Sequence, residues 1–282
     1  MKNGKLMVLP TVGWLSLFFI VPMLIVVAVS FASRTAYGQV VFNFTFANYA
    51  RITESLYLSI FAQTFIVAVV TTLFTIVMAY PLAYYIASLP KKWQQPGLIL
   101  VMVPFWINFL IRSYAWVIIL RTQGVLNTIL MKLGIIDLPM QFLYNDMAVL
   151  LGMIYSLLPF MVLPVYVSIE QLDRRLLEAA SDLGASPFTA FRKVTLPLTM
   201  PGVAAGTILV FISSLGMFIV PDVMGGARSA LIGNVIQNQF LSARDWPFGS
   251  ALSIVLAVMS LVLIILYYKA IQGQKGGKSQ NA

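Results

Sequence analysis

Long apolar runs separated by short polar stretches account for most of the chain. A helix that crosses a membrane needs about 20 consecutive, mostly apolar residues. Six stretches meet this requirement, and their expected bounds are 10–31, 58–87, 98–120, 148–169, 202–221 and 249–268. The pattern therefore predicts an all-α integral membrane protein in which the whole chain, 1–282, forms a single transmembrane domain.

The polar segment between the fourth and fifth runs has a helical pattern of its own. In "IEQLDRRLLEAASDL", residues 169–183, apolar residues recur at helical spacing with charged residues between them. This spacing predicts an amphipathic helix that lies outside the lipid core. Gly184 follows directly, where helices commonly end with a residue in the left-handed conformation.

A second short helix is expected immediately after this turn. Ser186 is a typical N-cap residue, and Pro187 suits the first position of a helix. The segment "PFTAFRKVTL" then forms the helix, which we expect Pro197 to end before the next span begins. The loop 170–201 is thus predicted to hold a helix, a glycine-centred turn and a second helix.

The basic residues are divided unequally between the two sets of loops. The chain carries a net charge of +9, and an even number of spans places both termini on one side of the membrane. The loops on that side hold eleven basic residues, namely Lys2, Lys5, Lys91, Lys92, Arg174, Arg175, Arg192, Lys193, Lys269, Lys275 and Lys278. The opposite loops hold six, namely Arg34, Arg51, Arg121, Lys132, Arg228 and Arg244. Because cytoplasmic loops are enriched in Lys and Arg, both termini and the loop 170–201 are expected in the cytoplasm.

This topology accounts for the positive charge, so no nucleic-acid partner is expected. Lys2 and Lys5 before the first apolar run also resemble the start of a secretory signal peptide. The run is long for such a signal, and its removal would leave five spans, so a retained helix is expected.

Composition narrows the possible functions. The chain is 60% hydrophobic and 10% charged, and it has no cysteine and no histidine. Thiolate nucleophiles, disulfides, the usual general base and the commonest metal ligands are therefore missing, so we expect no catalytic residue, no metal site and no enzyme. The spans also lack Asp and Glu away from their ends. An ion-coupled secondary transporter usually places an acidic residue there, so that class is the weaker alternative.

Six residues of the polar segment occur at a specific spacing. They are Glu178, Ala179, Ala180, Gly184, Leu196 and Pro197. Three residues separate Ala180 from Gly184, and nine more precede "VTLP". The spacing resembles the EAA loop of ABC importer permeases, in which Ile stands where this chain has Val194.

The resemblance implies a type I ABC importer permease with six transmembrane helices and a cytoplasmic coupling helix. In this family the loop sits in a cleft of an ATP-hydrolysing subunit, so Glu178 would contact that subunit and Gly184 would allow the turn. ATP and Mg²⁺ would bind to the ATPase subunits, so this chain is expected to bind no cofactor.

The same resemblance implies partners and a location. The partners are a second, homologous but different permease subunit, two cytoplasmic ATPase subunits, a periplasmic or extracellular solute-binding protein, and membrane lipid. The location is the bacterial cytoplasmic (inner) membrane, with the chain crossing it several times.

Five further stretches carry a more particular resemblance. They are "PFWINFLIRSYAW" (104–116), "LLPFMVLPVY" (157–166), "PDVMGG" (221–226), "LIGNVIQNQF" (231–240) and "RDWPFGSALS" (244–253). They resemble the polyamine (spermidine/putrescine) branch of these permeases, which implies import of a polyamine. Relatives that move other small solutes share parts of these stretches, so a permease for another small solute is the alternative.

A polyamine pathway needs carboxylates for the ammonium groups and aromatic faces for cation–π contacts, worth about 0.5–2 kcal/mol each. The candidate pathway residues are Trp106, Tyr114, Asp222, Asp245 and Trp246. Tryptophan and tyrosine also anchor helices at the membrane interface, and each aspartate also fits a solvated loop charge. Both interpretations stay open from the sequence.

Arg112 is the one charged residue that falls inside an expected span. A charge within the membrane marks a functional candidate, but an arginine would repel a polyamine. We expect it to pair with a carboxylate or a backbone carbonyl, or to face water. Counted from Leu98 along a straight helix, it lies about 21 Å along the span, toward the outer side.

Overall fold

A computed structural model of the chain divides it into two compact units, and each is described by itself. The described residues are 10–35, 37–173, 175–226 and 230–279, with side chains of the last helix as far as residue 269. The units comprise residues 1–61 with 232–282, and residues 62–231. Six of the basic residues counted above lie outside the described residues or side chains: Lys2, Lys5, Arg174, Arg228, Lys275 and Lys278.

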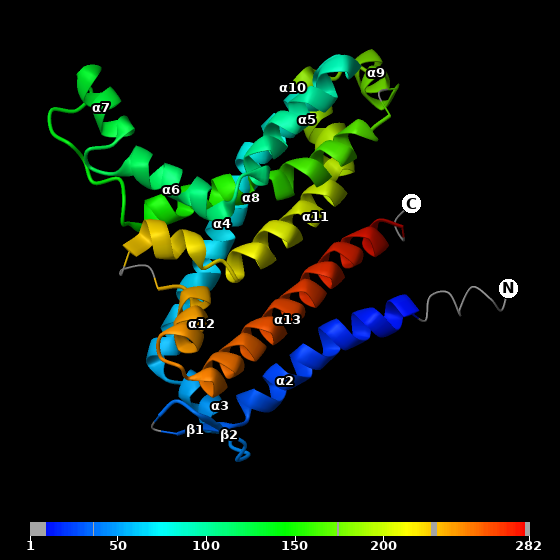
Figure 1. Ribbon diagram of the computed structural model, residues 1–282. Helices are drawn as coiled ribbons and strands as arrows, with labels where there is room; N and C mark the ends of the chain where they lie inside the picture. The colour runs from blue at the N-terminus through cyan, green and yellow to red at the C-terminus, as the bar shows by residue number, and fades with distance from the viewer. Residues whose placement is uncertain (1–9, 36, 174, 227–229, 280–282) are drawn as a thin grey trace. The chain divides into compact units, whose positions relative to one another are not determined.

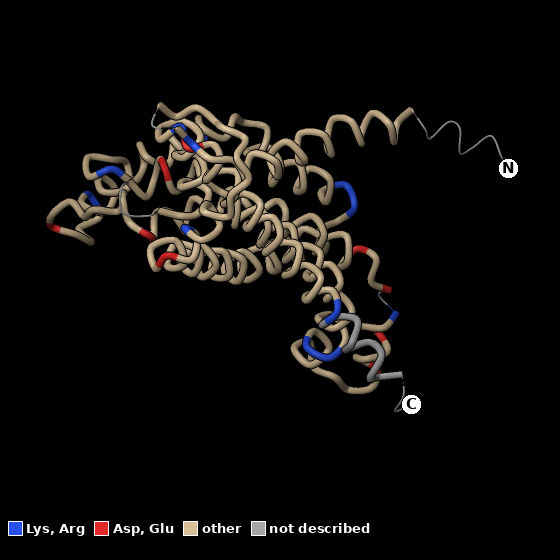
Figure 2. Tube along the Cα trace, turned by 90° about the horizontal axis from the view of Figure 1, so that it is seen from below, with Lys and Arg blue, Asp and Glu red and all other residues tan. Residues whose placement is uncertain are grey.

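The prediction of six apolar spans is confirmed, with one of them broken. Within the described residues, five helices are long and apolar enough to cross a membrane: Pro10–Ser30, Ser55–Ser88, Asp146–Glu170, Pro187–Leu215 and Trp246–Lys269. The sixth is a bent pair, Lys91–Trp106 and Phe109–Lys132, whose two parts meet at 91°. Charged residues gather at the helix ends and in the loops, and most of the helical length carries none (Figure 2).

The first unit joins the N-terminal and C-terminal spans. Its elements are η1 (Ser16–Ile20), α2 (Val21–Ser30), β1 (Ser33–Arg34), β2 (Val40–Val41), α3 (Ala47–Ile52), the start of α4 (Ser55–Ser88), α12 (Ile232–Leu241) and α13 (Trp246–Ser279). β1 and β2 form an antiparallel hairpin, and α2 packs along α13 (Figure 1). Phe248 and Leu252 on α13 are fully buried in the apolar core of this unit.

The second unit holds the remaining spans. Its further elements are α5 (Lys91–Trp106), α6 (Phe109–Leu120), α7 (Val125–Lys132), α8 (Asp146–Glu170), α9 (Arg175–Asp182), α10 (Pro187–Ala190), η2 (Phe191–Thr195), α11 (Leu196–Leu215) and η3 (Pro221–Gly225). α8 and α11 lie side by side and form its most extensive helix–helix contact (Figure 1).

Two glycines four residues apart bring α11 close to α8. A Cβ atom on Gly202 would overlap the carbonyl oxygen of Pro164 and the hydroxyl of Ser168. A Cβ atom on Gly206 would lie 2.5 Å from the sulfur of Met161. Small residues at this spacing let helix backbones approach closely in membranes, so α8 and α11 form a tightly packed pair.

The prediction of one straight span over 98–120 is wrong. Ile107 and Asn108 are extended, and the Asn108 side chain accepts a hydrogen bond from the Leu110 N–H at 2.9 Å, which makes it the N-cap of a new helix. The depth assigned to Arg112 by counting along a straight helix is therefore wrong as well. Asn108 is the sequence signal that could have revealed the break, because asparagine favours N-caps over helix interiors.

The prediction that Pro197 ends a helix is also wrong. The helix continues from Pro187 to Leu215, so the expected span 202–221 begins and ends too late. A π turn, η2, lies directly before α11, and the Leu196 N–H donates to the Phe191 carbonyl five residues earlier. A helical proline clashes with the carbonyl four residues before it, here that of Lys193 inside the wider turn, so the turn accommodates Pro197.

The predicted amphipathic helix over 169–183 is shorter than expected. α8 ends at Glu170, and α9 begins at Arg175. The Asp173 side chain accepts a hydrogen bond from the Arg175 N–H at 3.0 Å, and such local side-chain bonds favour the start of a new helix over continuation of the old one. Ile169 therefore belongs to the fourth span.

Candidate functional site

The glycine-centred turn between α9 and α10 has the predicted conformation. Gly184 has φ = +79°, its N–H donates to the Ser181 carbonyl at 2.9 Å, and the Ala185 N–H donates to the Ala180 carbonyl at 3.0 Å. These two bonds form a Schellman motif, which satisfies carbonyls that a helix end leaves unpaired. The motif fixes the angle at which the chain leaves α9.

The second helix also begins as predicted. The Ser186 hydroxyl accepts a hydrogen bond from the Thr189 N–H at 3.3 Å, and Pro187 is the first helical residue. This N-cap and the Schellman motif together define the turn from both sides, so α9 and α10 are held as a helix–turn–helix.

The helix–turn–helix exposes several apolar side chains. Leu176 and Phe188 are exposed, and Leu183 is 88% exposed. Glu178 and Ala179 are exposed between them. Exposed apolar residues can mark a contact site, so we call Leu176, Leu183 and Phe188 the loop surface.

A cavity of about 360 Å³ lies beside α9. It is lined in part by Tyr84, Ser88, Lys91, Glu170, Leu177 and Glu178. Lys91 at the start of α5 forms a 3.0 Å ion pair with Glu170 at the end of α8. α9 is thus separated by open space from the turn that joins α4 to α5.

The candidate pathway residues of the second unit lie on different elements. Trp106 ends α5, Tyr114 lies on α6 beyond the break, and Asp222 lies in η3. All three are exposed in this chain. Asp222 is therefore in a short π turn after α11, and not at the end of a continuous span as expected. Whether these residues line a pathway stays a prediction.

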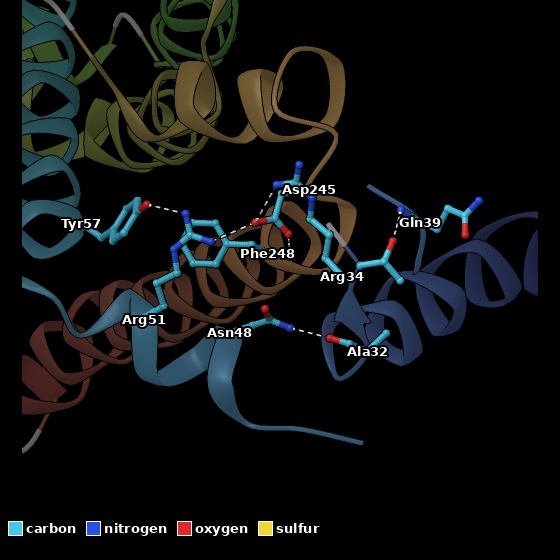
Figure 3. Close-up of polar contacts among 9 residues, drawn as sticks. Ala32, Arg34, Gln39, Asn48, Arg51, Tyr57, Asp245 and Phe248 are labelled. Atoms are coloured by element: carbon cyan, nitrogen blue, oxygen red, sulfur yellow. Dashed lines mark hydrogen bonds and ion pairs between the residues drawn. The ribbon is translucent and has the colours of Figure 1, made fainter. Parts of the chain in front are cut away.

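The other candidate carboxylate, Asp245, is buried in an ion-pair cluster of the first unit (Figure 3). It is 6% exposed, and its Oδ2 lies 2.9 Å from Nη1 of Arg51 and 3.8 Å from Nη1 of Arg34. Its Oδ1 accepts a hydrogen bond from the Phe248 N–H at 3.3 Å in the first turn of α13. The interpretation of Asp245 as a solvated loop charge is therefore wrong. Its neighbour Trp246, the first residue of α13, is exposed.

Arg51 is held on several sides in this cluster. Its guanidinium lies 3.9 Å from the centre of the Phe248 ring, and Nη2 donates to the Tyr57 hydroxyl at 3.2 Å. Burial opposes the charged form of Arg51, but hydrogen bonds to Asp245 and Tyr57 outweigh it and raise its pKa. The cluster fastens α3 to the start of α13. Sequence reasoning missed Arg51 because its partner is 194 residues away.

Arg112 spans the break in the third candidate span. Its Nη1 donates to the Pro104 carbonyl at 2.9 Å, and its guanidinium lies 5.0 Å from the Phe109 ring and 5.7 Å from the Tyr155 ring. The Pro104 carbonyl would bond to the N–H of residue 108 in a continuous helix, and the guanidinium replaces that donor. The predicted pairing with a carbonyl is confirmed, whereas the alternative of facing water is wrong because Arg112 is 6% exposed.

Across the residues that the structure describes, five long apolar helices, a bent sixth pair, and a helix–turn–helix that leads into the fifth span define a multi-span membrane protein. The chain belongs to the family of binding-protein-dependent transport system inner membrane components, whose family model matches residues 6–274. It is therefore a multi-pass permease subunit of an ABC importer, which confirms the predicted family and the predicted all-α transmembrane fold, while the cytoplasmic coupling helix stays a prediction.

Comparison with individual proteins agrees with this assignment. The chain is 46% identical over 264 residues to the spermidine/putrescine transport system permease protein PotB of Escherichia coli (strain K12), covering 94% of this chain and 96% of that protein. It is 42% identical over 108 residues to PotC of the same transport system and strain, covering 38% and 40%. A solved bacterial alginate ABC transporter, in complex with an alginate pentasaccharide-bound periplasmic protein, matches with a TM-score of 0.74 at 20% identity, covering 94% of this chain and 92% of that one. The last likeness bears on the fold alone.

Proposed function

We propose that this permease carries polyamines, spermidine or putrescine, into the cytoplasm, driven by ATP that partner subunits hydrolyse. The observation that carries the proposal is the 46% identity to PotB over nearly the full length of both chains. The alginate transporter has the same fold at 20% identity, so the fold by itself does not select the solute.

The exposed residues of the pathway candidates suit a polycation. Trp106, Tyr114 and Trp246 offer aromatic faces, and Asp222 offers an exposed carboxylate. Asp245 differs from these, because two arginines already surround its carboxylate. Its effect on transport would then come through the shape of the first unit and not through direct contact with an ammonium group.

The loop surface would dock on a cytoplasmic ATPase subunit. Glu178, Ala179 and Ala180 lie on α9, Gly184 forms the turn, and Leu196 and Pro197 begin α11. A short amphipathic helix can enter a groove by its apolar side chains, and Leu183 and Phe188 are exposed for such a contact. ATP hydrolysis on that subunit would leave this chain without a catalytic role and without a cofactor of its own.

The complete transporter would contain a second permease, two ATPase subunits and an external solute-binding protein. Similarity to both PotB and PotC supports a pair of different but homologous permeases. The alginate transporter was solved with a periplasmic protein, which supports an external receptor. The excess of basic residues on one set of loops supports cytoplasmic termini.

Uptake into vesicles that contain the complete transporter tests this function. With the solute receptor outside and ATP inside, labelled spermidine or putrescine should accumulate, and the other polyamine should compete. Accumulation driven by a pH gradient without ATP would instead support an ion-coupled carrier. ATP-dependent uptake of a different solute, with polyamines failing to compete, would support the alternative of a related importer.

A further inference from the structure

The two helices that lead into and out of the coupling loop are fastened to each other. α8 leads into α9, and α11 continues from α10 through η2. Gly202 and Gly206 bring the two backbones together at Pro164 and Met161. Movement of the loop would therefore displace α8 and α11 together. The elements that this pair contacts are the ones to which the movement would be transmitted.

The incoming helix α8 is joined to α4 and α5 by a buried amide. The Tyr166 hydroxyl donates to Oε1 of Gln94 at 3.2 Å, and Gln94 is 4% exposed. Its Nε2 donates to the carbonyls of Ala87 at 3.0 Å and Leu89 at 2.9 Å, at the end of α4. One amide thus closes the turn between α4 and α5 and holds α8 against it.

The outgoing helix α11 is joined to α4 by a second tyrosine. The Tyr80 hydroxyl lies 2.8 Å from Oγ1 of Thr199, and Thr199 is fully buried. Thr199 donates in turn to the Thr195 carbonyl at 2.8 Å, within the π turn. The Phe191 ring packs edge-on against Tyr80, with centroids 5.8 Å apart. The π turn is therefore held to α4.

Direct contact between α9 and the α4–α5 turn is limited by the 360 Å³ cavity. The Lys91–Glu170 ion pair crosses near it, but the Lys91 side chain is largely exposed, and exposed pairs of this kind contribute little. The two buried tyrosine contacts are thus firm polar connections between the helices of the loop and α4–α5.

We propose that Tyr166 and Tyr80 are positioning residues that transmit movement of the coupling loop to α4 and α5. The inference rests on the proposed coupling of this loop to ATP hydrolysis. Neither tyrosine belongs to the candidate pathway residues or to the loop surface. Tyr166 links α8 to α5, and Tyr80 links α11 to α4. Movement of the α8–α11 pair would therefore also move α4 and the broken span that begins with α5.

The test compares Tyr166→Phe, Tyr80→Phe and the double variant in the complete reconstituted transporter. Each change removes one hydroxyl and keeps the ring, so packing is retained. We expect solute taken up per ATP hydrolysed to fall about fivefold for each single variant, the effect of a hydrogen bond worth about 1 kcal/mol, and further for the double variant. ATP hydrolysis without receptor and membrane abundance should stay at wild-type values, and any loss of thermal stability should be no larger than in a variant that loses a similar hydrogen bond elsewhere.

Tyr49→Phe is the matched control. The Tyr49 hydroxyl lies 2.7 Å from Oγ of Ser30 in the first unit, so the change removes the same kind of contact outside the loop helices. Thr199→Ser keeps the hydroxyl partner of Tyr80 and should retain coupling, whereas Thr199→Val should reproduce Tyr80→Phe and add nothing to it.

Wild-type uptake per ATP in both tyrosine variants would overturn the inference. So would equal losses in Tyr49→Phe, or losses that follow thermal stability, because they indicate a structural role. Failure of the unmodified transporter to couple uptake to ATP would instead refute the proposed function.

Discussion

Arg51 and Asp245 are 194 residues apart in the chain and form a 2.9 Å ion pair in the first unit. Through this pair the segment after the first span is joined to the start of the last. The Phe248 ring packs against the guanidinium at 3.9 Å and shields the pair from water on that side. The contact belongs to the framework of the unit.

Removing the carboxylate should destabilise the first unit. In Asp245→Asn the guanidiniums of Arg51 and Arg34 lose their anion, and we expect a loss of about 1–2 kcal/mol because the Arg51 side chain is partly exposed. Thermal unfolding in detergent measures the change. Asp222→Asn, at an exposed carboxylate, is the control and should leave the unfolding temperature unchanged.

The pH dependence of this contact follows from the raised pKa of Arg51. A raised pKa contributes stability that is fully present below the unfolded value and is lost only as pH rises through the folded value. That value lies in strong alkali, so Arg51 should contribute equally between about pH 6 and about pH 9. A loss of stability in Arg51→Gln that differs between these two pH values would contradict this.

A side chain at Gly184 should abolish transport without removing the protein from the membrane. In Gly184→Val the φ of +79° becomes strained by about 1 kcal/mol or more, although no heavy atom lies within 4 Å of the new Cβ. Gly134→Val is a matched control, since Gly134 has φ = +69° and equally open surroundings. Uptake should fail in the first variant alone. Normal uptake in Gly184→Val would contradict a coupling role for the turn.

Adding one methyl group at Gly202 should weaken the α8–α11 pair. The Cβ atom of Gly202→Ala would overlap the backbone oxygen of Pro164, which cannot rotate away. We expect a loss of about 1–3 kcal/mol and lower membrane abundance. Gly13→Ala places the same atom in open space on another span and should be neutral. Equal abundance of the two variants would show that the close approach is unimportant.

Replacing Arg112 should loosen the break between α5 and α6. Arg112→Met keeps much of the side-chain volume but leaves the Pro104 carbonyl without its donor, at a cost of about 1–3 kcal/mol. The thermal unfolding temperature and the rate of solute uptake should both fall. Arg121→Met, at an exposed arginine after α6, is the control. An unchanged unfolding temperature in Arg112→Met would show that Arg112 does not stabilise the break between α5 and α6.

The orientation of the chain can be measured by cysteine labelling, because the sequence contains no cysteine. Leu183 on the loop surface is 88% exposed, and Tyr37 in the β1–β2 hairpin is 92% exposed. With cytoplasmic termini, an impermeant thiol reagent outside intact cells should label Tyr37→Cys and not Leu183→Cys. The reverse labelling pattern would place the coupling loop outside and contradict the proposed topology.

Local patterns predicted local structure well. Gly184, Ser186 and Pro187 take the positions expected of them, because a C-cap and an N-cap depend on residues within one helical turn. Hydrophobic periodicity likewise predicted the number of spans, since a membrane sets the required length. The identity of the family followed from the spacing of Glu178 and Gly184.

Features that depend on distant residues were not predictable. The sequence leaves Asp245 as either a pathway carboxylate or a solvated loop charge, because its arginine partners lie far away in the chain. Nothing in the local sequence marks Gln94, because its contact with α8 depends on Tyr166, which lies on another helix. The break at Asn108 was missed because its surroundings are apolar enough to read as one span. Proline disfavours helix interiors, so Pro197 was expected to end the helix, but the π turn before it lets the helix continue.

The π turn at Phe191–Thr195 lies between Gly184 and Pro197, a stretch whose length is fixed in the motif. Each residue of an α-helix advances the chain by about 100° around its axis, and a π turn holds more residues than an α turn. Because the π turn holds one more residue in about the same rotation, deleting one residue there would restore regular winding and leave Glu178 facing nearly the same direction relative to α11. The extra residue instead gives the proline its room, so a chain one residue shorter would keep the direction of the loop but would kink where Pro197 meets the carbonyl four residues before it.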